Sequence, residues 1–319
     1  MKHNSNQLAV INNQLSSIRY GCLSLIGYCS LIIVFCLTSC TSIIQVTVPN
    51  GTTQLVVDAF LDNSAKPQTV RITTSANYFS EVSCPPVLGA TVGLTDLTNA
   101  KTFLFTPDGN GNYIYTPTAT DTMGYVNHKY QLNIAYSGNT YIALSTLYPT
   151  VAVDRIRFCN SSLNPVDSIS NAGDTAKPRV YYPYFYATDN KGVGNYYWVK
   201  VYNNGVFYSQ PGQMNIFEDA GFGANDGGLI SGANSYYNLT NDKNPIYRND
   251  TCTIAIYSTD ANTNDFLAQL QTQMTNAQSG LFAVTPQNVK TNVQQTSGTQ
   301  PAIGWFNIGA LKSRSVVAR

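Results

Sequence analysis

Short segments in which apolar and polar residues alternate recur along most of the chain after residue 50. Alternation places successive side chains on opposite faces, so each segment is typical of a half-buried β-strand. The clearest examples are residues 69–74, 90–96, 130–136 and 251–257. Turn sequences such as 107–111 (PDGNG) and 137–139 (SGN) lie between them. The pattern therefore predicts a mainly β protein.

The strand segments fall into two regions. Seven or so between residues 51 and 150 have the spacing of an Ig- or transthyretin-like β-sandwich. Residues 151–319 are expected to form a second β-rich domain, which includes two aromatic segments at 179–187 (RVYYPYFYA) and 195–202 (NYYWVKVY). Asn203-Asn204-Gly205 after the second is a strong hairpin turn.

One helix is predicted in the second domain, at about residues 263–277. Its apolar residues recur at helical spacing and would pack on a sheet; they are Phe266, Leu267, Leu270 and Met274. Asp260 or Thr263 can cap its start, and Gly280 follows its end.

The N-terminus has the features of an export signal. Lys2 and Arg19 precede an apolar run at 20–37, which ends in 37–40 (LTSC). This tetrapeptide looks like a bacterial lipobox. Residues 1–39 are therefore predicted to be a lipoprotein signal peptide, with Cys40 lipidated and residues 40–50 acting as a tether. The alternative is an uncleaved membrane anchor in which the cysteine has no role.

Composition excludes several functions. Charged residues make up only 11% of the chain, against about 25% in a typical soluble protein, and the net charge is +1. A nucleic-acid binder usually carries a basic excess. His3 lies in the signal, so His128 is left as the one mature imidazole, expected in a solvated turn. No Gly-x-Ser-x-Gly or His-Glu-x-x-His motif is present, and we expect no enzyme and no cofactor.

Two features leave alternatives open. Cys84, Cys159 and Cys252 remain after signal cleavage and lipidation, as either one disulfide plus a buried thiol or three buried thiols. The loop 218–228 carries three acids among glycines, so Glu218, Asp219 and Asp226 are weak candidates for a Ca²⁺ site. An ordinary turn explains the same residues.

Eight short elements occur in a characteristic order along the chain: 55–62 (LVVDAFLD), 67–72 (PQTVRI), 89–92 (GATV), 130–134 (YQLNI), 153–156 (VDRI), 195–198 (NYYW), 286–293 (PQNVKTNV) and 302–306 (AIGWF). Their order resembles the DUF4249 family of Bacteroidetes, predicted outer-membrane lipoproteins without an assigned activity. Arg155 departs from the serine usual at its position. The resemblance implies a partner, because genes of such proteins often neighbour those of TonB-dependent transporters. It carries over no catalytic residue.

Two further expectations concern the envelope setting. Surface-exported lipoproteins of this phylum often carry acids just after the lipidated cysteine, and residues 41–45 (TSIIQ) have none, so periplasmic and surface exposure both stay open. Three tripeptides are similar to the Bacteroidetes O-glycosylation signal, which makes Thr122, Ser168 and Thr175 glycosylation candidates in predicted loops.

Three functions compete. The leading hypothesis is a non-enzymatic, lipid-anchored binding or accessory protein of the outer membrane that works with a TonB-dependent transporter. The tyrosine-rich strands favour a glycan-binding or adhesion module instead, because exposed tyrosine stacks on sugars. A hydrolase would need a pocket with convergent acids, and no such cluster is evident in the sequence.

Overall fold

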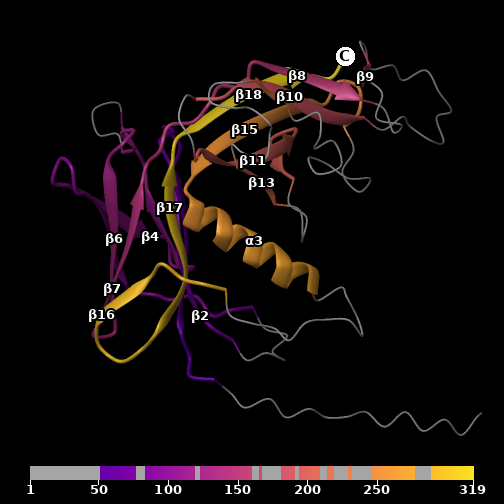
Figure 1. Ribbon diagram of the computed structural model, residues 1–319. Coiled ribbons are helices and arrows are strands. Elements are labelled where there is room, and N and C mark those ends of the chain that lie inside the picture. The colour runs from indigo at the N-terminus through magenta and orange to yellow at the C-terminus, as the bar shows by residue number, and fades with distance from the viewer. Residues whose placement is uncertain are drawn as a thin grey trace, which may run out of the picture. The chain divides into compact units, whose positions relative to one another are not determined.

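A computed structural model describes residues 51–76, 83–118, 123–159, 165–166, 181–190, 194–208, 214–218, 229–231, 246–276 and 289–319. Within these ranges the chain is mainly β with one helix, which confirms the predicted fold class. Figure 1 shows the strands and the helix α3. The one described helix is too short and too polar to cross a membrane.

The first region is a nine-stranded sheet in the order β16-β7-β6-β3-β4-β5-β2-β1-β17. Its strands are β1 (Leu55–Asp62), β2 (Gln68–Thr74), β3 (Thr91–Asp96), β4 (Lys101–Pro107), β5 (Asn112–Tyr115), β6 (Lys129–Tyr136), β7 (Asn139–Thr146), β16 (Gln294–Ser297) and β17 (Ala302–Gly309). β4 connects the β16-β7-β6-β3 part of this sheet to the β5-β2-β1-β17 part, because it pairs with β3 along most of its length and with β5 at Thr106 and Pro107. The end strand β17 also lies against β7, where the amide of Ile308 donates to Ser145.

The second region contains two smaller sheets. One has the order β14-β10-β8-β9, built from β8 (Arg155–Cys159), β9 (Pro165–Val166), β10 (Tyr182–Thr188) and β14 (Leu229–Ser231). The other has the order β12-β11-β15-β18, with β13 also paired to β11. Its strands are β11 (Tyr196–Asn203), β12 (Val206–Phe207), β13 (Asn215–Glu218), β15 (Thr251–Thr259) and β18 (Leu311–Val317).

The two regions share strands, so the sheets do not divide at residue 150. β16 and β17 come from the C-terminal part of the chain and complete the first sheet, where β17 runs parallel to β1. Only Ala310 separates β17 from β18, which pairs with β15 in the second region. The yellow strands β17 and β18 in Figure 1 therefore connect both regions, and residues 51–150 alone lack two strands of their sheet.

Each region has its own core. Alternate residues of β1, beginning with Leu55 and Val57, are buried in the first core together with Phe306 and Ile308 of β17. Alternate residues of β11 enter the second core, which includes Val199. The other face of each strand is only partly covered, and these outer faces meet α3.

Helix α3 (Ala261–Asn276) begins two residues before the predicted start and contacts β11, β13 and β17. Asp260 is its N-cap, because its Oδ1 accepts from the amide of Thr263 at 2.7 Å. Phe266 and Leu267 are buried and Leu270 is half-buried, as the helical spacing predicts.

Candidate functional site

A groove of about 490 Å³ lies where α3 faces β1, β17 and β11. Most of its lining is apolar or aromatic, with Asp58 and Gln273 as the polar side chains. The residues around it are Val56, Val57, Asp58, Phe60, Trp198, Met214, Phe266, Leu267, Leu270, Gln273, Val289, Ile303, Gly304 and Trp305. A preformed apolar pocket with few polar groups is the usual form of a small-molecule site.

Strand alternation explains why these residues meet. In β1 the inward residues fill the first core, which turns Val56 and Phe60 outward toward α3. In β11 the inward residues fill the second core, which turns Trp198 outward. The groove is therefore formed by the outer faces of strands from both regions, closed on one side by the helix.

The groove holds both tryptophans of the chain. The rings of Phe266 and Trp305 stack with centroids 4.7 Å apart. Phe60 meets Trp198 edge to face at 5.3 Å. Such contacts fix the rings of Phe60, Trp198, Phe266 and Trp305 relative to one another. We call these four rings the aromatic wall, and it is formed before any ligand binds.

Two opposite charges lie beside the aromatic wall. The Lys200 ammonium is 4.0 Å from the Trp198 ring centroid and 4.7 Å from that of Tyr257. Burial lowers the pKa of Lys200 to about 8, although Asp62 and Asp58 favour its charged form. Burial among neighbouring atoms raises the pKa of Asp58, against the attraction of Lys200 and Arg71. The Asp58 side chain is nevertheless exposed to solvent, so a ligand in the groove can reach its carboxylate.

A buried hydrogen-bond network holds the groove from beneath. The Trp305 indole donates to the Thr263 hydroxyl at 3.0 Å, which itself donates to Asn307 at 3.1 Å. The Asn307 amide donates to the Tyr257 hydroxyl at 3.0 Å, and this hydroxyl donates to the carbonyl of Leu61. The network joins β1, β15, β17 and α3, and so ties both regions to the groove.

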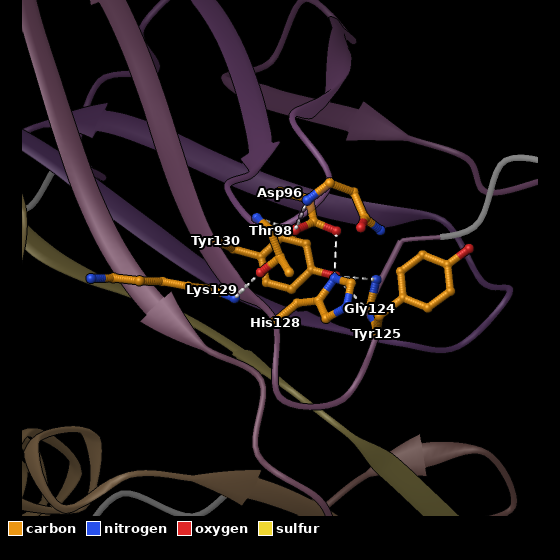
Figure 2. Close-up of polar contacts among 8 residues, drawn as sticks. Asp96, Thr98, Gly124, Tyr125, His128, Lys129 and Tyr130 are labelled. Atoms are coloured by element: carbon orange, nitrogen blue, oxygen red, sulfur yellow. Dashed lines mark hydrogen bonds and ion pairs between the residues drawn. The ribbon is translucent and has the colours of Figure 1, made fainter.

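His128 lies away from the groove, in the cluster drawn in Figure 2. Its Nδ1 is 2.8 Å from Oδ2 of Asp96, whose side chain is 1% exposed. The nearby Tyr130 hydroxyl accepts from the amides of Gly124 and Tyr125, and burial raises the pKa of Tyr130 to about 12. The histidine is thus half-buried and paired, rather than solvated as predicted. These contacts fasten the turn before β6 to the end of β3, which is a structural role.

The other predicted site residues are mostly outside the described ranges. Glu218 ends β13, and its carboxylate accepts from the Tyr196 hydroxyl at 3.3 Å. Its proposed Ca²⁺ partners Asp219 and Asp226 lie outside the residues that the structure describes. The same holds for the lipidation candidate Cys40 and for the glycosylation candidates Thr122, Ser168 and Thr175.

Cys84, Cys159 and Cys252 are free thiols. Cys159 and Cys252 are buried, and burial raises their thiol pKa values to about 11 and about 12. Cys84 is exposed and lies outside the first core. Neither arrangement considered from the sequence is therefore found.

The aromatic strands do not form an exposed tyrosine surface. In β10, Tyr184 is buried and Tyr186 is half-buried, with the Arg155 guanidinium 4.2 Å from the Tyr186 ring. In β11, Tyr197 is buried and Tyr196 is half-buried.

The groove beside α3 was not predicted from the sequence. The sequence feature that could have revealed the groove is Lys200, which lies two residues after Trp198 on the strand face that does not enter the core.

The fold and the groove define a mainly β protein with a groove lined by aromatic residues between its two regions. The model of the family described as "Domain of unknown function (DUF4249)" matches residues 41–315. The chain therefore belongs to the DUF4249 family, which confirms the resemblance seen in the sequence. Among curated proteins, no match is found.

Proposed function

We propose that this protein is a non-enzymatic, lipid-anchored binding protein of the bacterial outer membrane and an accessory to a TonB-dependent transporter. The observation that carries the binding role is the groove beside α3, with its preformed aromatic wall and accessible carboxylate. Membership of the DUF4249 family supports the accessory role through the genomic neighbourhood that the resemblance implies.

The anchor follows from the N-terminal sequence. An apolar run that ends in 37–40 (LTSC) favours cleavage before Cys40 and lipidation of its thiol. Residues 40–50 then link the lipid to β1, which starts at Leu55. Several acyl chains give stable membrane attachment without a spanning helix.

The lining of the groove restricts the ligand. Its aromatic and aliphatic walls favour a small apolar molecule, and Asp58 adds one acceptor that can receive a hydrogen bond. Lys200 already has two carboxylates nearby, Asp58 and Asp62, that balance its charge. The expected ligand is therefore an uncharged apolar molecule with a hydrogen-bond donor.

Co-purification tests the partner. The protein, tagged after the exposed C-terminal Arg319, is extracted from native outer membranes in mild detergent, and the bound proteins are identified by mass spectrometry. We expect a TonB-dependent transporter in amounts comparable to the tagged protein. Cys40→Ala, which cannot be lipidated, is the control and should be absent from the outer-membrane fraction and lose the transporter. Recovery of wild-type protein in the membrane without a transporter would refute the accessory role.

A further inference from the structure

A second pocket, of about 300 Å³, lies at the junction between the two regions and is separate in its lining from the groove. Three segments surround it: residues 148–149 after β7, residues 194–196 at the start of β11, and residues 259–262 where β15 leads into α3. The lining combines tyrosine rings with amide, carboxylate and hydroxyl groups, which differs from the apolar lining of the groove.

Two tyrosine rings are available in this pocket. Tyr148 is 44% exposed, although its carbonyl is fixed by a 2.6 Å hydrogen bond from the Ser258 hydroxyl. Tyr196 is held by its hydroxyl, which donates to Glu218. Gly194 has a φ of +85°, and even a Cβ there would come no closer than 4.0 Å to the Tyr196 ring. Gly194 has no side chain, so this position does not cover the Tyr196 ring.

Polar groups surround the rings. Asp260 uses Oδ1 to cap α3, which leaves its second carboxylate oxygen for other partners. Asn195 and Asn262 add amide groups that can both donate and accept. Thr259 is only 3% exposed, yet its hydroxyl has no hydrogen-bond partner among the residues that the structure describes. A buried hydroxyl without a partner is costly, so a ligand that bonded to it would gain stability.

The charges around the pocket restrict the charge of the polar ligands that it can bind. Asp260 lines it and Glu218 accepts a hydrogen bond from the Tyr196 hydroxyl, whereas no basic side chain is part of the lining that the structure describes. Anionic ligands are therefore disfavoured. Tyrosine rings with carboxylate, amide and hydroxyl groups around them suit a molecule that has one apolar face and many hydroxyls.

We infer that this pocket is a binding site for a neutral sugar. One face of the pyranose ring stacks on the exposed ring of Tyr148, and the sugar hydroxyls bond to Asp260, Asn262 and Thr259. The site goes beyond the proposed function, since it has its own lining and its own class of ligand. It also gives the sugar-binding alternative a location, at the start of the aromatic segment 195–202.

Titration of the purified protein with sugars tests the inference. The probes are glucose, galactose, mannose, xylose and N-acetylglucosamine, their β-1,4-linked or α-1,4-linked disaccharides, and glucuronic acid, followed by ligand-observed NMR. We expect saturable binding of at least one neutral sugar and none of glucuronic acid. Tyr148→Ala should weaken binding about tenfold through lost stacking, and Thr259→Val about threefold through a lost hydrogen bond.

Two controls separate the pocket from the rest of the surface. Tyr247→Ala removes another exposed tyrosine, 39% exposed, and should leave sugar binding unchanged. Leu270→Gln alters the groove and should also leave it unchanged, so failure of the sugar site and failure of the groove are distinguishable. The inference is overturned if none of the neutral sugars binds, or if they bind equally well to Tyr148→Ala and wild type.

Discussion

Gly304→Ala is expected to lower the free energy of unfolding by about 3 kcal/mol or more. Gly304 lies in β17 opposite Val57 of β1, in the parallel pair that joins the C-terminal part of the chain to the first sheet. Its φ of +108° is a conformation that only glycine adopts readily, and a Cβ there would collide with the backbone oxygen of Val57. The strands would have to separate, which would also disturb the groove that both strands line.

Urea unfolding followed by tryptophan fluorescence measures this loss, because Trp305 directly follows Gly304. Gly138→Ala is the matched control: its φ of +78° is also positive, but nothing lies within 4 Å of the added methyl group. We expect it to cost about 1 kcal/mol, from backbone conformation alone. Equal losses in the two variants would show that β17 does not approach β1 as described.

Asn307→Ala is expected to cost about 3 kcal/mol. Asn307 is 1% exposed, and its side chain donates to the Tyr257 hydroxyl at 3.0 Å and accepts from Thr263 at 3.1 Å and from Ser145 at 3.3 Å. Removing it leaves several buried polar groups short of partners on β7, β15 and α3 at once. The cost should therefore exceed that of one ordinary hydrogen bond.

Thermal unfolding followed by circular dichroism measures the stability lost in Asn307→Ala and in a control variant. Asn112→Ala is the control, since the Asn112 amide bonds to Asp108 at 2.8 Å but in an exposed turn. We expect it to cost less than about 1 kcal/mol, because water replaces the lost bond. If Asn307→Ala were no more destabilising than Asn112→Ala, the buried hydrogen bonds of Asn307 would not stabilise the contact between the two regions.

Strand positions could be predicted from alternation, but strand partners could not. β15 contains the alternating segment at 251–257, although only Thr251 and Thr253 are half-buried and both faces of the strand are buried from Ile254 to Thr259. β17 is buried without alternation from Trp305 to Gly309, so the sequence shows a strand there but no face. Its parallel pairing with β1 joins residues about 250 positions apart, for example Leu55 with Ala302, and no local pattern encodes such a partner.

The candidate site was harder to predict than the fold. The side chains of Phe60 and Trp198 point away from the cores of their strands, as many strand residues do. They line a groove only because α3 packs across both strands. His128 was expected in water because it precedes a strand in a polar turn, whereas the buried partner Asp96 lies 32 positions earlier. The helix cap at Asp260 was predictable, since the cap and its partner Thr263 are neighbours in sequence.

Binding of an uncharged apolar probe tests the central claim most directly, namely that the groove beside α3 is a ligand site. N-phenyl-1-naphthylamine is apolar and carries one N–H donor, and both tryptophans of the chain line the groove, so probe and protein fluorescence report the same event. We predict saturable binding of one probe per chain that quenches the tryptophans. Leu270→Gln should raise the dissociation constant about tenfold, because it places an amide in the apolar wall. Leu104→Gln, at a side chain that is 68% exposed, should change nothing. Absence of saturable binding, or equal binding by the Leu270→Gln variant, would contradict the account.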